Sequence, residues 1–399
     1  MDNRKFKLKN IIAILLMVLI VCYSAVNLIM NWSYFEYAID SGWDFESRTK
    51  QLDTVANGQG VGHDWVMDQY SEVQNLLEKK VSNGFQVLRD SDGELNYINF
   101  FPYETYDFQH YGERLHEVAE VTEENGGKFL FISAANLSQG MLDSQSEFPV
   151  ADFKARTDAL FYYLQGYGVS YLDSRLVLKK SGIDESLLRY KTDSRWTVEA
   201  SFEVLKGTLQ KIREAFDLEL DPQGTYLEDE SFERTVYSNS FSGEFARLAG
   251  IPFAGKEDFT LYTPTFQTDF TVTTSHFNQE VTAHGSFEEV LVANEILTEE
   301  NPYYRNMFYA YLGGQAPRRV ITNNINPESP KILLIGDEYA APYAALMAPL
   351  AGELHYIWPY DNPSVDDLEA YIEENDFDYV FMVLAPTSMT PTGFHILDD

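Results

Sequence analysis

The chain has 399 residues, of which 45% are hydrophobic and 15% aromatic, so it can bury a sizeable core and is not a disordered protein. Its formal net charge of −33 excludes nucleic acid as a partner, because the phosphate backbone would be repelled. Cys22 is the single cysteine, so no disulfide can form within the chain and the core alone must stabilise the fold. For an exported domain, this composition favours a bacterial surface protein from an organism with one membrane.

The first predicted element is a membrane-spanning helix. Residues 11–30 carry no charge, and at ~1.5 Å per residue they would cross a hydrocarbon core of ~30 Å. No small-residue cleavage site follows, so we predict an uncleaved anchor over residues 11–31, with a cleaved signal peptide as the alternative. Four basic residues precede the apolar run, which predicts a cytoplasmic tail over residues 1–10 and a single-pass cell-membrane protein. They are Arg4, Lys5, Lys7 and Lys9.

The body beyond this anchor is strongly acidic. Of the 29 basic and 62 acidic residues, only those four and Asp2 lie in the first 31 positions, which leaves 25 against 61. We expect this body outside the cytoplasm. A helical stalk or cap is predicted over residues 32–90, because one helix face carries regularly spaced apolar side chains and a glycine-rich stretch, residues 57–62, divides the region. The apolar side chains are Val66, Tyr70, Val73, Leu76 and Leu77.

Residues 91–399 have the pattern of an α/β domain. Short apolar runs predict strands buried on both faces, and they alternate with helical segments, so we expect a mainly parallel sheet covered on both sides. The strands are expected at 128–133, 169–173, 331–336, 353–358 and 378–385, and the helices at 151–166, 197–212 (capped by Thr197), 339–350 and 365–375. Residues 220–300 interrupt this rhythm and predict a β-rich insertion.

One strand-to-helix turn is a candidate site. Gly336, Asp337 and Glu338 follow the predicted strand at 331–336, where ligands gather in open α/β sheets and where the next helix points backbone N–H groups at a ligand. Such a turn suits a nucleophile beside an oxyanion hole. The plain alternative is an ordinary turn with an acidic helix cap.

Residues 90–390 resemble a known family. Four blocks carry the resemblance in order: YKTDSRWTVEASFEVL from Tyr190, FSGEFARLAGI with GKEDFTLYTP from Phe241, YAYLGGQAP from Tyr309, and ILLIGDEYAAPYAALMAPLAGELHYI from Ile332. This part of the chain resembles the DHHW branch of the SGNH hydrolase-like superfamily, which is related to membrane-anchored alginate O-acetylation proteins. The resemblance implies an α/β/α sandwich, a membrane O-acyltransferase as partner and a cell-surface glycan as ligand.

The catalytic triad of that family is incomplete here. The family pattern D-x-H-W matches Asp193 and Trp196, but Arg195 stands at the position of the histidine. In the family's D-S-Y block, Glu338 stands at the position of the nucleophilic serine. Arginine stays protonated and cannot act as the base, and a carboxylate would oppose an oxyanion in the same pocket. The triad mechanism therefore cannot run.

The resemblance also implies a pocket for an oxyanion or ligand. Gly313, Gly314 and Gln315 match a G-G-N block whose backbone and amide hold the oxyanion in the family. Gly336, Asp337 and Trp196 complete the expected pocket.

Two arrangements of the exchanged residues are considered. Glu338 and Arg195 could form a salt bridge in place of the serine–histidine hydrogen bond, with Asp193 as a second acceptor. Alternatively, Arg195 contacts Asp193 and Glu338 points to solvent.

No metal or cofactor is expected, since the seven histidines form no metal-binding pattern. His355, in the strand after the Glu338 helix, is the least implausible substitute base.

Two functions follow from this pattern, with a purely structural role as a third. The first is a pseudo-enzyme that binds a glycan or a partner in surface-polymer O-acylation, using tyrosines as stacking platforms unless these pack in the core (Tyr303, Tyr304, Tyr309 and Tyr311). The second is an esterase, O-acetyltransferase or glycan hydrolase of altered mechanism, in which Glu338 works with Asp337 or Asp193. Against the second, Arg195 is expected to lower the pKa of Glu338.

Overall fold

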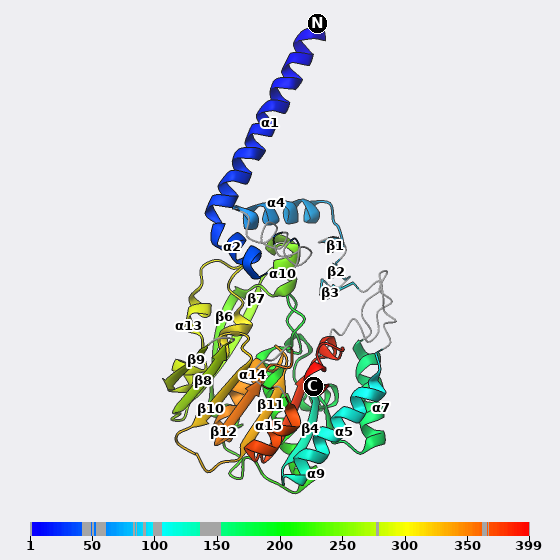
Figure 1. Ribbon diagram of the computed structural model, residues 1–399, viewed down its shortest axis with the longest axis vertical. Coiled ribbons are helices and arrows are strands. Elements are labelled where there is room, and N and C mark those ends of the chain that lie inside the picture. The colour runs from blue at the N-terminus through cyan, green and yellow to red at the C-terminus, as the bar shows by residue number, and fades with distance from the viewer. Residues whose placement is uncertain are drawn as a thin grey trace. The chain divides into compact units, whose positions relative to one another are not determined.

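The chain divides into two compact units, residues 1–77 and residues 78–399. The computed structural model describes residues 2–41, 61–82, 86–90, 93–98, 106–135, 153–276, 279–360 and 367–398, with the single positions 49, 52, 84 and 365. Figure 1 shows their helices and strands.

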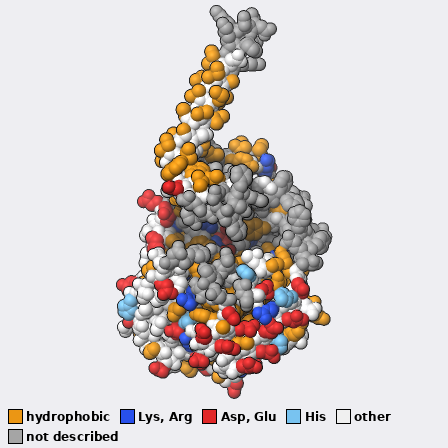
Figure 2. Space-filling view, viewed as in Figure 1, with side chains coloured by type: hydrophobic (Ala, Val, Ile, Leu, Met, Phe, Trp, Pro, Cys, Tyr) orange, Lys and Arg blue, Asp and Glu red, His pale blue; other side chains and the backbone are white. Residues whose placement is uncertain are grey.

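The first unit contains three described helices: α1 (Asp2–Met30), α2 (Trp32–Ser41) and α4 (His63–Leu76). The segment Asn10–Met30 has 21 residues and a mean hydropathy of 2.7, so it is long and apolar enough to cross a membrane, and none of it is buried in the protein. Figure 2 shows hydrophobic side chains covering this helix, whereas acidic side chains are scattered over the visible face of the body. The predicted stalk helix is α4, while residues 57–60 of the glycine-rich stretch lie outside the described residues.

The second unit is built on an eight-stranded sheet of order β5-β4-β13-β11-β12-β10-β8-β9. The first five strands in this order are parallel, and β10, β8 and β9 are antiparallel to their neighbours. The parallel strands confirm the predicted ones. Their bounds are β4 Lys128–Ser133, β5 Tyr171–Asp173, β11 Lys331–Gly336, β12 Glu353–Ile357 and β13 Tyr379–Leu384, and those of the antiparallel strands are β8 Phe270–His276, β9 Gln279–Gly285 and β10 Arg318–Asn323.

Helices cover both faces of this sheet, as predicted (Figure 1). Strand β11 supplies Ile332 and Leu334 to the core on one face and Leu333 and Ile335 to the core on the other, because successive side chains alternate. The first core also contains α9 (Val198–Phe216) and α14 (Ala340–Met347), and the second contains α5 (Phe108–Glu124), α7 (Phe153–Tyr167) and α15 (Leu368–Asn375). Thr197 caps α9 as predicted, with its hydroxyl accepting from the amide of Ala200 at 3.1 Å.

The β-rich region over 220–300 is present, but only part of it stands apart from the main sheet. Strands β6 (Phe232–Phe241) and β7 (Glu257–Pro264) form a separate antiparallel pair, whereas β8 and β9 extend the main sheet beyond β10. A third small sheet contains β1 (Val81–Ser82), β2 (Val87–Arg89) and β3 (Leu95–Tyr97). Strand β2 pairs with β1 on one side and with β3 on the other. The second unit accordingly begins at Glu78, whereas the sequence predicts its start at residue 91.

Short helices connect these elements. The α-helices are α8 (Ser174–Ser181), α10 (Glu244–Ala249), α11 (Ile251–Ala254), α12 (Phe287–Val290) and α13 (Asn294–Thr298). The 3-10 helices are η1 (Glu185–Leu187), η2 (Asp229–Ser231), η3 (Met307–Ala310), η4 (Ala348–Leu350), η5 (Pro386–Ser388) and η6 (His395–Leu397).

Gly336 lets α14 pack closely on the end of β11. A Cβ at this position would lie 2.5 Å from the Cβ of Ala340 and 3.2 Å from the carbonyl oxygen of Val383. Neither neighbour is the end of a flexible side chain, so any larger residue would push the helix away from the sheet.

We therefore expect Gly336→Ala to lower the free energy of unfolding of the body by about 1–3 kcal/mol, measured by urea unfolding of the full chain in detergent micelles. Gly166→Ala is the matched control, since a Cβ there, on α7, meets nothing within 4 Å. This control should stabilise the body by about 0.5–1 kcal/mol, because alanine favours helix. Equal effects of the two substitutions would show that close packing at Gly336 is not required.

Candidate functional site

The loop before α9 is fixed against the turn after β11. The indole N–H of Trp196 donates to the carbonyl oxygen of Tyr339 at 2.8 Å, and the hydroxyl of Tyr339 donates to the carbonyl oxygen of Ser194 at 2.9 Å. Both aromatic side chains are fully buried. These reciprocal bonds join the loop that carries Asp193 and Arg195 to the turn that carries Glu338, two segments more than 140 residues apart in the chain.

Asp193 is a buried acceptor with every hydrogen bond supplied by the protein. Its carboxylate accepts from the Arg195 amide at 3.0 Å, from Arg195 Nε at 2.7 Å and Nη2 at 2.5 Å, and from the Glu244 amide at 2.9 Å. Burial alone would raise the pKa of Asp193, but the guanidinium charge and these hydrogen bonds outweigh it and hold this pKa below its usual value. The carboxylate is therefore ionised at neutral pH and committed to Arg195.

The same loop is fixed from the side of β7 and α10. The amide of Gly243 donates to the Thr192 hydroxyl at 2.9 Å, and Glu257 accepts from the amides of Lys191 and Thr192 at 2.8 and 2.7 Å. A Cβ at Gly243 would lie 2.3 Å from the Thr192 carbonyl oxygen and 2.4 Å from the Asp193 Cβ, so the two segments are in close contact.

Arg195 is buried and bidentate to Asp193. Its Nη2 also donates to the Asn306 side-chain oxygen at 3.3 Å, and its guanidinium carbon lies 4.3 Å from the ring centre of Phe308 and 5.3 Å from that of Tyr309. No ion pair or hydrogen bond joins Arg195 to Glu338, both of which the structure describes. The hypothesis of an Arg195–Glu338 salt bridge is therefore wrong, because the nearer carboxylate of Asp193 matches the guanidinium fork.

Glu338 is half-buried and takes part in a different contact. Its carboxylate accepts from Gln315 Nε2 at 3.2 Å, and the same nitrogen lies 3.1 Å from the Tyr309 hydroxyl oxygen. Burial raises the pKa of Glu338 to about 7; the charge of Arg195 opposes this rise, and those of Asp337 and Glu244 support it. Arg195 therefore lowers the pKa of Glu338 as expected, but loss of water is the larger effect and the net shift is upward.

Asp337 differs from its neighbour in having no free oxygen. The carboxylate is fully buried and accepts from the amides of Tyr339 at 3.0 Å and Ala385 at 2.8 Å, which fastens the turn to the segment after β13. The Tyr356 hydroxyl donates to the Asp337 carbonyl oxygen at 2.9 Å. Burial raises the pKa of Asp337 to about 6, although hydrogen bonds from Ser388 and from the two amides oppose the rise. We infer that Asp337, like Gly336 and Trp196, builds the site rather than contacts a ligand.

Gln315 owes its position to a left-handed turn. Leu312, Gly313 and Gly314 have φ angles of 64°, 69° and 96°, a run that favours glycine. The turn follows η3 and brings the Gln315 amide to Glu338 and Tyr309. Gln315 and Glu338 are thus in contact, as the resemblance implied, although Glu338 has replaced the family's nucleophilic serine.

The predicted substitute base lies elsewhere. His355 pairs with Leu333 in the middle of the sheet and bonds with the Tyr371 hydroxyl and with Glu353, so its ring faces α15. Burial lowers the pKa of His355 to about 4. His355 is therefore a neutral core residue and not a base for Glu338.

The four tyrosines considered as stacking platforms have different environments. Tyr303 and Tyr311 are buried in the core, whereas Tyr304 is exposed and Tyr309 is half-buried beside Glu338. Only the last two can meet a ligand, and only Tyr309 lies at the site.

Sequence reasoning missed Asn306 and Glu244. Asn306 is buried, and its side-chain nitrogen has no hydrogen-bond partner. Glu244 begins α10, where its amide binds Asp193 and its charge acts on Glu338. Glu244 lies in the quoted block from Phe241, which was the available signal, whereas Asn306 lies outside all four blocks and is brought to the site by the fold alone.

Among the described residues, no group of three His, Cys, Asp or Glu side chains is arranged to hold a metal ion.

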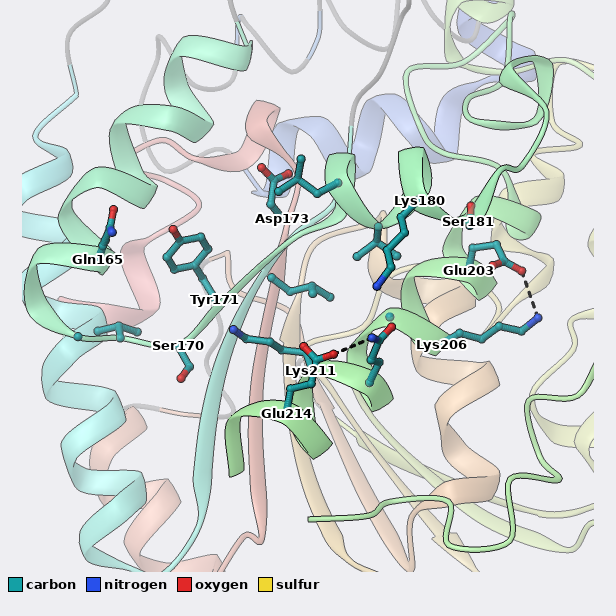
Figure 3. Close-up of a pocket in the computed structure, with 17 residues that line it drawn as sticks. Gln165, Ser170, Tyr171, Asp173, Lys180, Ser181, Glu203, Lys206, Lys211 and Glu214 are labelled. Atoms are coloured by element: carbon teal, nitrogen blue, oxygen red, sulfur yellow. Dashed lines mark hydrogen bonds and ion pairs between the residues drawn. The ribbon is translucent and has the colours of Figure 1, made fainter. Parts of the chain in front are cut away.

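A separate groove lies at the free edge of the sheet, outside the candidate site. It has a volume of about 750 Å³ and lies between β5, α8 and α9. Lys180, Lys206 and Lys211 line it together with Glu203 and Glu214 (Figure 3). Lys206 is paired with Glu203 at 3.1 Å. None of the residues at the triad positions lines this groove.

Comparisons with known proteins show the fold. No protein-family model matches the chain, and none of the curated proteins matches it in sequence. Among solved structures, a DHHW family protein from Eubacterium siraeum is 15% identical with a TM-score of 0.54, and the match covers 78% of this chain and 94% of that one. PatB1 of Bacillus cereus with a sulfonyl adduct is 17% identical with a TM-score of 0.62, over 78% and 97% of the two chains. The second unit therefore has the DHHW-type, SGNH-like fold that the resemblance predicted.

Proposed function

We propose that this protein is a membrane-anchored, extracytoplasmic SGNH-like pseudo-enzyme that binds a glycan or a protein partner in the O-acylation of a cell-surface polysaccharide. The observation that carries the proposal is the closed pair of Asp193 and Arg195 at the position of a catalytic dyad. Arg195 keeps its proton, because the adjacent carboxylate holds its pKa above an already high value. The position of the family's histidine therefore holds no group that can accept a proton.

Binding is supported by the polar groups that remain beside Arg195. The half-buried Glu338 and Tyr309 form, with the exposed Gln315, a cluster that can donate and accept hydrogen bonds. Because the pKa of Glu338 is about 7, its carboxyl group can act as donor or acceptor near neutral pH. Hydroxyl-rich ligands such as glycans present both kinds of partner, and the Tyr309 ring adds a stacking surface.

The N-terminus supports membrane anchoring, and the resemblance supports a role beside other proteins of surface-polysaccharide O-acylation. The apolar segment Asn10–Met30 would serve as the anchor with the basic tail in the cytoplasm. The resemblance supplies a membrane O-acyltransferase as the partner and a cell-surface glycan as the ligand.

An enzyme of altered mechanism is the second candidate, favoured by the near-neutral pKa of Glu338, which suits a general acid or base. It needs a second working carboxylate. Asp193 and Asp337 are both buried and occupied by Arg195 or by backbone amides, so neither of the two expected partners is available. Because Glu338 has no second carboxylate to work with, we favour the binding function over the altered enzyme.

Turnover by the full chain in detergent micelles tests the proposal. With aryl acetates and acetylated glycans, the wild-type chain and its Glu338→Ala variant should both show only the background rate. Restoring serine and histidine in the double variant Glu338→Ser, Arg195→His should produce measurable hydrolysis, because Asp193 can then orient the imidazole. Wild-type turnover that Glu338→Ala abolishes would overturn the proposal in favour of the altered enzyme.

A second prediction concerns the closed pair. Arg195→Ala should lower the free energy of unfolding by about 3–5 kcal/mol, because Asp193 would be left charged and buried without its partner. Arg213 offers a matched control, since it makes the same kind of two-point contact with Glu219 at 2.6 and 2.8 Å but on the surface. Arg213→Ala should change stability by less than about 1 kcal/mol in the same urea titration. Similar losses for both variants would mean that burial adds nothing to the Arg195 pair.

A third prediction follows from the pKa of Glu338. The folded pKa of about 7 exceeds the usual 4.5, so between these values the folded state binds more protons than the unfolded state. The stability contribution of this group therefore falls as pH rises from 4.5 to 7. Relative to wild type, Glu338→Gln should gain on the order of 1–3 kcal/mol of stability over this interval.

Unfolding curves at several pH values measure this gain, with the exposed Glu230→Gln as the control. A Glu338→Gln difference that stays flat with pH would show that Glu338 is ionised throughout.

A further inference from the structure

Helix α4 has its polar side buried and its apolar side exposed. Ser71 and Gln74 are buried, at 0% and 4% exposure. The large apolar side chains lie on the opposite arc and are between 46% and 83% exposed: Trp65, Val66, Tyr70, Val73, Leu76 and Leu77. A helix on the surface of a water-soluble body normally has the reverse arrangement, with the apolar stripe facing the core.

The spacing places this exposed set in one stripe, which the exposed Gln69 interrupts at about 40° from Trp65. At 100° per residue, Trp65, Val73 and Leu76 lie within about 80° of one another, and the other three extend the stripe to about 140°. Ser71 and Gln74 fall outside that arc. Six large apolar side chains in one stripe are more than the single exposed residues that ordinary surfaces carry.

The start of α4 is fastened to the outer part of α1. The hydroxyl of Tyr23 donates to the carbonyl oxygen of Val61 at 3.0 Å, and the amide of Val61 donates to the side-chain oxygen of Asn27. Val61 lies two residues before α4, and Asn27 lies three residues before the end of the apolar segment. If α1 crosses a bilayer, α4 begins ~5–10 Å inside the end of that span, at 1.5 Å per residue.

Aromatic residues follow the end of the apolar segment. Trp32 and Tyr34 directly follow the apolar segment and are 53% and 51% exposed. Tryptophan and tyrosine concentrate at the boundary between headgroups and acyl chains. Trp65 and Tyr70 on the α4 stripe are of the same kind.

From these observations we propose that the apolar stripe of α4 lies in the headgroup–acyl boundary of the membrane that α1 crosses, so that the chain has a second, interfacial membrane contact. The inference rests on the membrane anchoring proposed above. The occupant is lipid rather than a soluble partner, because the start of α4 is hydrogen-bonded to Tyr23 and Asn27 within the apolar segment itself. Its driving force is burial of apolar area, since the helix itself carries acidic residues but no lysine or arginine.

The test uses the full chain in phosphatidylcholine vesicles that contain doxyl-labelled phosphatidylcholine. Cys22 is the native and only cysteine, and it lies inside the apolar segment, so a fluorophore on it reports the anchor. In a Cys22→Ser background, Leu76→Cys places the same fluorophore on the stripe, and Asn75→Cys places it about 100° around the helix as the matched control. Quenching by doxyl lipid is compared with quenching by aqueous iodide.

We expect doxyl lipid to quench the label at residue 76 several-fold more than the label at residue 75, with the reverse order for iodide. A quenched Cys22 label with equal, weak lipid quenching at residues 75 and 76 would overturn the interfacial contact and leave the anchor intact. An unquenched Cys22 label would overturn the anchor and this inference together. A label at residue 76 that is shielded from both quenchers would identify a protein contact and would also overturn the inference.

Discussion

The buried pair of Asp193 and Arg195 is the interaction on which the site depends. Two opposite charges have left water completely, which is tolerated only because every acceptor position of the carboxylate is used and the guanidinium lies against two aromatic rings. Through Glu244 and Asn306 the same pair binds α10 and η3 to the loop before α9. A catalytic dyad must keep one partner free to move a proton, and this pair leaves none.

The two adjacent carboxylates of the turn differ in burial and in hydrogen bonding. Asp337 is enclosed and bound by two backbone amides, so its charge fixes the turn to the end of β13. Glu338, one residue later, is only half-buried and meets a single side-chain amide. Burial raises both pKa values, but only Glu338 is partly exposed. Two carboxylates that are adjacent in the sequence therefore have different environments, one enclosed and one partly exposed.

The sequence predicted the fold better than the contacts of the site. Strands such as β4 and β11 are continuous apolar runs because both faces are covered, and this pattern is visible without coordinates. Arg195 pairs with Asp193 and not with Glu338 because of the positions and the burial of these side chains in the folded protein. The spacing of residues in the sequence does not reveal either. The sequence also did not predict the face of β12 on which His355 lies. Every side chain from Leu354 to Ile357 is buried, so no alternation of polar and apolar residues distinguishes the two faces. The sequence predicts β8 and β9 as part of an insertion, because the pairing of β8 with β10 and of β9 with β8 is a tertiary property.

Helix α4 illustrates the same limit in a different way. Its apolar spacing predicted one helix face correctly, but periodicity does not say which face meets the protein. The structure buries Ser71 and Gln74 and leaves the apolar stripe outside, an arrangement that is unfavourable if water surrounds the helix on that side. The same arrangement is favourable if a bilayer lies against the stripe, because the apolar side chains are then removed from water, as they would be in a protein core. In the interfacial contact proposed above, an amphipathic helix beside a membrane span would be stable with its polar side buried. The hydrogen bonds of Val61 to α1 would keep the start of α4 near the end of the apolar segment.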